Sequence, residues 1–373
     1  MNAIRERIEM AVPSTLFMLT PDFLSQVLQA DVRAVKVLAT NIGNGMTSSI
    51  VRLGLEYAQD EYDGTGCLAF GLPTTLIAKF ASFNDFVRGE CVRLGFYERE
   101  VYFYKELAAR TDARTPVCYY AAFDPDTGRC LLLLEDLTDH MRESSPRGCS
   151  IDRARLAVQA MAGLHAGWWD HPELREIPHF FRAPSKHEAI VTMFWDFFRQ
   201  GMGFGDSPEI RHLEVVLRRE TGAAEAVMSE GPLTLVHNDF QLDNLSFGLP
   251  GQSPEVVLMD WGIYTTARGA ADLAYLLVGS LSIEDRRACE TLLMQEYVDA
   301  LARLGVEGYT LEHCLADYRR AMLIYYTRYM IAICTVGAID GPDGKVIDPQ
   351  TIENSMPVLR RYHAAIADHY SVR

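Results

Sequence analysis

The sequence lacks a long apolar run, a cysteine pair at Cys-x-x-Cys spacing and any low-complexity tract. Its longest apolar stretches, 273–281 and 330–336, are far too short to span a bilayer, and charges near the N-terminus replace the apolar run of a secretory signal. The eight cysteines are scattered, as is typical of reduced thiols. We therefore predict a cytoplasmic protein without a membrane segment, a zinc ribbon or a dithiol redox site.

Positive charge is also scarce. The chain carries 35 Lys and Arg against 50 Asp and Glu, which gives a formal net charge of -15. A nucleic-acid-binding surface normally needs clustered Lys and Arg to meet the phosphate backbone, so we expect no nucleic-acid partner. The acidity would favour a cationic substrate if it gathered at the mouth of a cleft, and otherwise it serves solubility.

Apolar residues make up 49% of the 373 positions, enough for one bilobal unit or two modest domains. Residues up to about 29 predict one or two helices, the second opened by Thr20 and Pro21. Runs of β-branched residues and turn signals then predict an antiparallel sheet with one long helix near residues 96–107. From about residue 150 the pattern becomes mainly helical. We place the two domains at residues 1–137 and 138–373.

The expected strands and helices fall into two groups along the chain. The five strands of the N-terminal sheet are expected at 35–40, 49–57, 74–80, 117–123 and 130–134. Two short strands are expected at 233–236 and 256–259, among helices at 151–169, 187–200, 207–228, 283–304 and 311–336. The chemical motifs directly follow the two short strands.

A motif of the form His-x-Asp-x-x-x-x-Asn follows the first short strand, as His237, Asp239 and Asn244. Phosphoryl transfer needs a carboxylate that orients and deprotonates the attacking hydroxyl, and oxygen ligands for Mg²⁺. Asp239 suits the first role and Asn244 the second. The motif alone is of moderate specificity, because three fixed residue types can meet by chance in a chain of this length.

The second short strand ends in Asp260, Trp261 and Gly262, sixteen positions after Asn244. An acid at this place can hold Mg²⁺, and the glycine lets the chain turn sharply away from the metal. Two surface turns that carry Asp and Asn by chance would explain neither the order of the motifs nor the strands before them. We therefore predict Asp239 as catalytic base and Asn244 and Asp260 as metal ligands.

Glycines and a serine connect the first two strands. Gly43, Gly45 and Ser48 could fold over phosphates with backbone N–H groups, or they could form an ordinary turn. Lys79 lies on the third strand among apolar residues, where an unpaired ammonium would be costly. Glu100 is its expected partner, because helical spacing places Glu100 on the apolar face and Glu98 on another.

A buried strand ends in the acidic pair Glu135 and Asp136. In a two-lobed kinase this segment would be the hinge, where main-chain N–H and C=O groups at Glu135 and Leu137 read the adenine edge. Such contacts use main-chain groups that nearly every residue has, so the sequence does not identify them.

These residues together resemble the aminoglycoside phosphotransferase and choline kinase superfamily, and among its branches the ecdysteroid-kinase-like small-molecule kinases. The resemblance runs from the Gly43 hairpin through Lys79 and Glu100 to the His237 loop and Asp260, and it ends at the segment 269–274. It thus covers most of the chain. Asn238 stands where many relatives have glycine.

The resemblance implies an α+β, protein-kinase-like bilobal fold, with a small antiparallel β-sheet N-lobe and a larger, mainly helical C-lobe. It also implies ATP and Mg²⁺ as cofactors, a small-molecule alcohol as substrate, Asp272 as a buried acid that steadies the catalytic loop, and His237 as its brace. No counterpart of the Ala-Pro-Glu segment of protein kinases follows Gly262, which argues against protein substrates.

The acceptor stays open at this stage. An aminoglycoside, a choline-like alcohol and a steroid-like alcohol are all compatible with the motifs, and a kinase-like protein that binds ligand without catalysis is the alternative. Aromatic residues on the later helices could line a pocket or belong to the core: Phe194, Trp195, Phe197, Phe198, Tyr325, Tyr326 and Tyr329. Few acids near the C-terminus favour an aromatic or steroid-like alcohol over an aminoglycoside. The sequence shows neither a Gly-x-Ser-x-Gly elbow nor a His-Glu-x-x-His helix.

Overall fold

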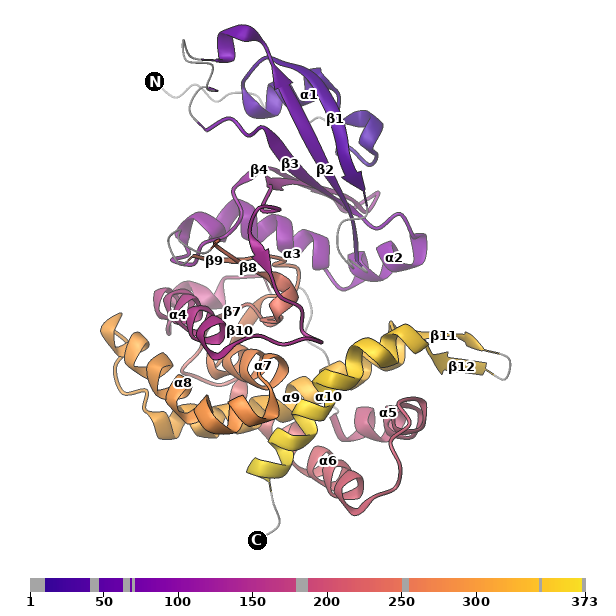
Figure 1. Cartoon of the computed structure of the whole chain (residues 1–373), viewed down its shortest axis with the longest axis vertical. Coiled ribbons are helices and arrows are strands. Elements are labelled where there is room, and N and C mark those ends of the chain that lie inside the picture. Colours follow the sequence, from indigo (N-terminus) through magenta and orange to yellow (C-terminus); the bar gives the residue numbers. More distant parts are fainter. Residues whose placement is uncertain are drawn as a thin grey trace. The chain divides into compact units, whose positions relative to one another are not determined.

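The computed structural model describes residues 11–40, 47–62, 68, 71–178, 187–249, 255–341 and 344–370. The chain divides into two compact units, one of residues 1–110 with 115–139 and the other of 111–114 with 140–373. The first contains an antiparallel sheet and the second is mainly helical (Figure 1). The predicted α+β class is confirmed.

The first unit is built on five antiparallel strands in the order β1-β2-β3-β5-β4. These strands are β1 (Val32–Thr40), β2 (Ser48–Tyr57), β3 (Thr75–Ala81), β4 (Cys118–Asp124) and β5 (Arg129–Glu135). The expected five strands are all present. β5 is buried from Cys130 to Leu134, as suits a strand between β3 and β4 with both faces covered.

The first helix, α1 (Pro21–Leu28), begins where the sequence predicts. Thr20 Oγ1 accepts a hydrogen bond from Phe23 N at 3.2 Å, and Pro21 needs no donor at the first helical position. The helix buries Phe23 and Leu24 in a core that includes Leu53 and other residues of β2, β3 and β5. This cluster covers one face of the sheet.

The helix predicted near residues 96–107 is present, but a second helix that the sequence did not predict lies before it. A separate helix, α2 (Asp85–Arg93), comes before it, capped by Asn84, whose side chain accepts from Val87 N at 3.1 Å. Gly95 at φ 70° lies in the left-handed region, so the helical path is interrupted before α3 (Phe96–Tyr102). A π-helical turn over Phe103–Leu107 follows.

The second unit holds seven α-helices among its described residues: α4 (Ile151–Gly167), α5 (His187–Gly201), α6 (Pro208–Met228), α7 (Ala270–Ser280), α8 (Ile283–Arg303), α9 (Leu311–Thr335) and α10 (Pro349–His369). Its strands are β6 (Met141–Arg142), β7 (Thr234–Val236), β8 (Leu245–Phe247), β9 (Val256–Leu258), β10 (Thr265–Ala267), β11 (Ala338–Gly341) and β12 (Gly344–Ile347). They pair as β6-β8-β9, β10-β7 and β11-β12.

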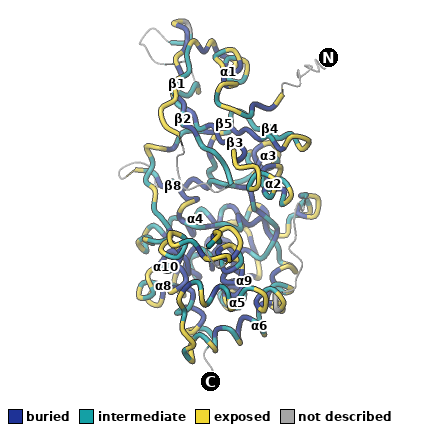
Figure 2. The backbone as a smooth tube through the Cα atoms, turned by 90° about the vertical axis from the view of Figure 1, so that its right-hand side faces the viewer, coloured by how far each residue is buried: buried dark blue, intermediate teal, exposed yellow. Residues whose placement is uncertain are grey.

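Helix α9 lies at the centre of this unit and packs on α5, α6, α7, α8 and α10. Buried positions run along it, while the outer turns of its neighbours are exposed (Figure 2). The sequence did not predict α7, α10 or the β11-β12 hairpin. Nearly every residue of α7 is buried, so this helix has no polar face to reveal its period. No helix in the described part of the chain combines the length and apolarity needed to cross a bilayer.

His363 on α10 makes the stability of this core depend on pH. Its Nε2 lies 2.8 Å from Tyr326 Oη, its ring centroid lies 4.8 Å from that of Phe204, and burial lowers its pKa from 6.5 to about 4. As the pH falls below 6.5, His363 in the unfolded chain therefore binds a proton, whereas His363 in the folded chain stays neutral down to about pH 4.

We expect the free energy of unfolding to fall between pH 6.5 and about 4, where it loses at most about 3 kcal/mol through His363. Above pH 6.5 this residue contributes no pH dependence. His363→Gln should flatten the curve, which denaturant unfolding at a series of pH values would measure. Equal slopes for the two proteins would contradict the assignment.

Candidate active site

The loop that follows β7 is organised around His237, which is fully buried. Its Nε2 donates to Met259 O at 2.8 Å, so its Nδ1 is the acceptor for the N–H of Asp239 at 3.3 Å. The imidazole thus joins the loop to the end of β9. His237 acts on the loop itself, through hydrogen bonds at both ring nitrogens.

Asn238 occupies a backbone position that few side chains tolerate. Its φ is 68°, in the left-handed region, where Asn is among the best accepted residues after glycine. Its Nδ2 donates to Ile263 O at 2.8 Å, and its Oδ1 accepts from Tyr325 Oη and from Arg328. These bonds explain how Asn can stand where a glycine is expected.

Asp272 on α7 anchors the loop through hydrogen bonds to its backbone. This fully buried carboxylate accepts from the backbone N–H groups of His237 at 2.7 Å and Asn238 at 2.8 Å. His165 Nε2 lies 3.2 Å from it, while His165 Nδ1 bonds to Tyr297 Oη at 2.7 Å. A Cβ on Gly269 would collide with that tyrosine hydroxyl, so the segment before α7 needs glycine.

Asp239 is half-buried and held by its neighbours. Its Oδ2 accepts from Asn244 Nδ2 at 2.8 Å and Gln241 Nε2 at 3.1 Å, and the Tyr275 side chain also bonds to it. Burial raises the pKa of Asp239, and the charge of Asp260 raises it further, although its hydrogen bonds and His237 act in the opposite direction. A raised pKa brings a carboxylate closer to the range in which a general base works best at neutral pH.

Asn244 and Asp260 lie on segments that are hydrogen-bonded to each other. Asn244 O accepts from Met259 N at 2.9 Å, next to Asp260. Because Asn244 Nδ2 donates to Asp239, the side-chain atom left for a metal is its oxygen. Asp260 is held at φ 63°, a strained backbone of the kind that recurs at functional sites. An amide oxygen and a carboxylate fit Mg²⁺, which usually takes few protein ligands and completes its shell with phosphates and water.

In the first unit, Lys79 and Glu100 form a buried ion pair. Lys79 Nζ donates to Glu100 Oε1 at 2.7 Å, with the two residues 8% and 3% exposed. Ala78 and Phe80 point into the cluster with α1, so Lys79 projects from the opposite face of β3. Glu98 is exposed. Removing one partner would leave a buried charge, which makes the pair interdependent.

The segment after β5 is fixed by the sheet and by side chains. Glu135 N donates to Val117 O at 2.8 Å, and Glu135 Oε2 accepts from Val117 N at 3.0 Å. Asp136 accepts from Arg52 Nε at 2.5 Å. The Glu135 N–H is therefore already used, so its part in adenine recognition would fall to its carbonyl, with the Leu137 N–H beside it.

Gly43 and Gly45 lie outside the described residues, whereas Ser48 begins β2 and pairs with Ala81. Tyr97 on α3 holds this start of β2 in place. Its Oη donates to Thr47 O at 2.6 Å and accepts from Ser82 N at 2.9 Å. The sequence reasoning missed Tyr97, although its position beside Phe96 on a helix that packs on the sheet was the available signal.

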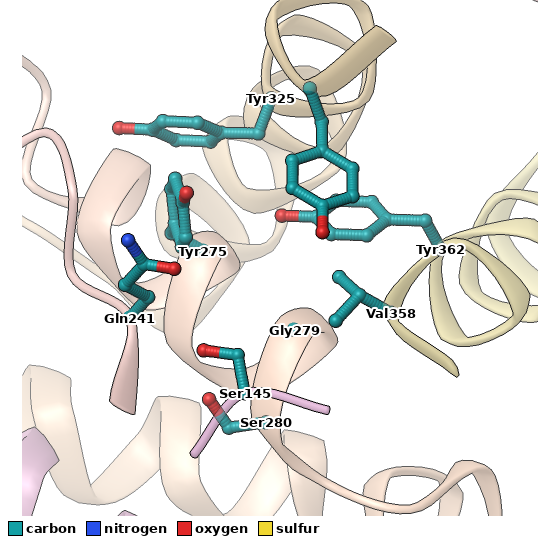
Figure 3. Close-up of a pocket in the computed structure, with 9 residues that line it drawn as sticks. Ser145, Gln241, Tyr275, Gly279, Ser280, Tyr325, Val358 and Tyr362 are labelled. Atoms are coloured by element: carbon teal, nitrogen blue, oxygen red, sulfur yellow. The ribbon is translucent and has the colours of Figure 1, made fainter. Parts of the chain in front are cut away.

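A pocket in the second unit lies beside Asp239. It is partly open to solvent and is lined by Ser145, Gln241, Tyr275, Gly279, Ser280, Tyr325, Tyr329, Val358 and Tyr362. Tyrosine rings form one side, and Ser145 and Ser280 face them (Figure 3). Among the aromatic residues singled out from the sequence, Tyr325 and Tyr329 line this pocket, while Trp195, Phe198 and Tyr326 are buried in the core.

The sequence reasoning missed the remaining polar residues of this pocket. Tyr275 lies three positions after Asp272 on α7, so helical spacing from that acid could have indicated it. Gln241 stands inside the catalytic motif. Ser280 and Tyr362 left no such signal, because they lie on α7 and α10, two helices that the sequence did not reveal.

Comparison with known proteins gives a family match over part of the chain. The model of the ecdysteroid kinase-like family matches residues 192–306, the stretch that contains the catalytic loop, Asp260 and Asp272. The curated proteins gave no match.

Solved structures match over nearly the whole chain. The GDP complex of wild-type aminoglycoside 2'-phosphotransferase-IIIa is 12% identical with a TM-score of 0.54, and the alignment covers 92% of this chain and 96% of that one. A GDP and kanamycin complex of a related aminoglycoside phosphotransferase is 11% identical, TM-score 0.55, covering 93% and 99%. A microcompartment-associated aminopropanol kinase is 13% identical, TM-score 0.51, covering 94% and 97%. At these identities the likeness establishes the fold.

Proposed function

We propose that this chain, whose fold is that of the aminoglycoside phosphotransferase and choline kinase superfamily, is an MgATP-dependent phosphotransferase that acts on a hydroxyl of a small molecule. The observation that carries the proposal is the setting of Asp239. This carboxylate is held by Asn244, Gln241 and Tyr275, and the last two also line the adjoining pocket. A hydroxyl bound in the pocket would thus meet a positioned base.

In the proposed reaction, the acceptor oxygen attacks the γ-phosphorus of ATP. The hydroxyl proton passes to a carboxylate oxygen of Asp239, the bond from phosphorus to the β,γ-bridging oxygen breaks, and ADP leaves with that electron pair. Mg²⁺ held by Asn244 and Asp260 would neutralise charge on the phosphate oxygens. The chain's own part is to orient the acceptor, accept its proton and keep the base in place.

The first unit would supply the nucleotide contacts. Lys79, held by Glu100, would meet phosphate oxygens as a point charge, and Gly43, Gly45 and Ser48 would belong to the phosphate loop. Glu135 and Leu137 would contact adenine through the main chain. These assignments stay predictions for this chain, as do the use of ATP and of Mg²⁺.

Nucleotide binding by the purified chain tests the proposal. Calorimetric titration should show ATP binding that depends on Mg²⁺, and Asp260→Asn should weaken it by about tenfold or more, because a neutral amide replaces a charged metal ligand. Asp340→Asn is the matched control, since Asp340 lies on the exposed β11-β12 hairpin. Unchanged affinity in Asp260→Asn would reject it as a metal ligand. An absence of any nucleotide binding by the wild type would favour the alternative, a kinase-like protein that binds another ligand.

A further inference from the structure

The side chain of Asn238 connects three segments of the second unit. Its Nδ2 donates to Ile263 O at 2.8 Å, on the segment that follows β9. Its Oδ1 accepts from Tyr325 Oη at 3.2 Å and from Arg328 Nη1, both on α9. Because Asp239 is the next residue along the chain, these bonds hold the backbone beside the proposed base against α9 and against the segment after β9.

The partners of Asn238 require an amide at this position. Arg328 can only donate and Ile263 O can only accept, so one orientation of the Asn238 amide satisfies both. A glycine would keep the backbone at φ 68° and lose all three bonds. An aspartate would place a carboxylate oxygen against Ile263 O. Asn thus combines a backbone that tolerates the left-handed region with a side chain that meets partners on both sides.

Helix α9 also reaches the base by a second route. The Tyr325 ring packs edge-on against the Tyr275 ring, with centroids 4.5 Å apart, and the Tyr275 side chain bonds to Asp239 (Figure 3). The Arg328 guanidinium lies 5.5 Å from the centroid of the Tyr325 ring. Tyr325, which is 3% exposed, therefore contacts a partner of the base with its ring and Asn238 with its hydroxyl.

We propose that Asn238 is a positioning residue: its bonds to α9 fix the distance between the base Asp239 and the wall of the acceptor pocket. This rests on the proposed function. Tyr325 and Tyr329 of α9 belong to that wall, so an acceptor bound there keeps its place relative to the base only while α9 and the loop stay together. A shift of about 1 Å in such an arrangement can cost about 10²-fold in rate.

Asn238→Gly tests the proposal, because glycine adopts φ 68° without strain and removes only the side-chain bonds. We expect kcat to fall about 10–100-fold with the best acceptor among ethanolamine, kanamycin, myo-inositol and an ecdysteroid, measured by ATP consumption. The KM for ATP should stay within about threefold, because Met259 N and O remain bonded to Asn244 and His237. Gln29→Gly, at an exposed left-handed position with φ 53°, is the matched control and should have wild-type kinetics.

A double-mutant cycle separates positioning from direct contact with the acceptor. Tyr325→Phe removes the hydroxyl that donates to Asn238 and keeps the ring. It should lower kcat about threefold to tenfold in the wild-type background and change it less than about twofold in the Asn238→Gly background. Tyr370→Phe, whose hydroxyl donates to Arg319 O, is the control. An equal effect of Tyr325→Phe in both backgrounds would overturn the proposal and assign this hydroxyl to the acceptor.

Hydrogen exchange of the loop gives a readout that needs no turnover. The backbone N–H groups of His237 and Asn238 donate to the buried Asp272. In Asn238→Gly, mass spectrometry of residues 237–244 should show exchange at least about tenfold faster than in wild type, because the loop opens more often. Peptides from α8 should keep their wild-type exchange, which would exclude a change in global stability.

The combined results decide between the outcomes. Faster loop exchange together with a lower kcat supports the proposal. A wild-type kcat in Asn238→Gly overturns it, and so does a lower kcat with unchanged loop exchange, which would mean that the side chain acts on a ligand directly. If none of the four acceptors is phosphorylated, the exchange result alone decides whether Asn238 holds the loop. Absence of nucleotide binding in addition would overturn the proposed function.

Discussion

Asp239→Asn is expected to lower kcat by about 10²–10⁴-fold, the range that a positioned general base contributes. Asn has the same shape and can still accept from Asn244, so the loop should keep its structure while the site loses its proton acceptor. ATP should bind with near wild-type affinity, because Asp239 is assigned to the acceptor hydroxyl and the metal is assigned to other residues. Steady-state kinetics with the best acceptor and calorimetry with ATP measure the two quantities.

The matched control is Asp196→Asn on α5, where the side chain is 81% exposed. It makes the same chemical change away from the pocket and should have wild-type kinetics. A rate within about threefold of wild type for Asp239→Asn would reject this residue as the base, given the contribution expected of one. A rate that fell together with ATP affinity would assign Asp239 to metal or nucleotide binding instead.

Asp272→Ala should produce the largest loss of stability among these variants. It leaves the N–H groups of His237 and Asn238, and the ring of His165, without their buried acceptor. Removing one partner from a buried charged network typically costs about 3–5 kcal/mol. For a unit of this size each kcal/mol lowers the melting temperature by about 2–4 °C, so we expect a drop of roughly 6–20 °C.

The Asp272→Ala variant should also lose catalytic activity at temperatures where it is still folded, because the loop that carries Asp239 loses its anchor. Thermal unfolding followed by circular dichroism, together with kinetics at low temperature, measures both effects. Asp152→Ala, an acid that is 91% exposed on α4, is the control for the loss of a carboxylate. A melting temperature within about 1 °C of wild type would contradict the structural role of Asp272, given the free energy expected.

Local chemistry in the sequence determined a large part of this protein. The strands of the first unit were predicted because β-branched runs and turn residues mark them directly, and the Thr20 cap marked α1. The pairing of Lys79 with Glu100 followed from periods of two and about 3.6, combined with the cost of an isolated buried charge. The order of Asp239, Asn244 and Asp260 indicated phosphoryl transfer before any contact was known.

Only the tertiary structure determined which residues from distant parts of the chain lie together, because sequence periodicity describes one helix or strand at a time. Helix α7 is buried nearly all round, so no stripe of polar residues reveals it, and with it Asp272 and Ser280 take their places. The pocket joins residues from the loop after β6, the catalytic loop, α7, α9 and α10, more than two hundred positions apart in the chain. The sequence states which residues can accept a proton, bind a metal or offer a hydroxyl. Which of them meet, and which hydroxyls are left for a ligand, depends on long-range packing, because these contacts are satisfied only when distant helices come together.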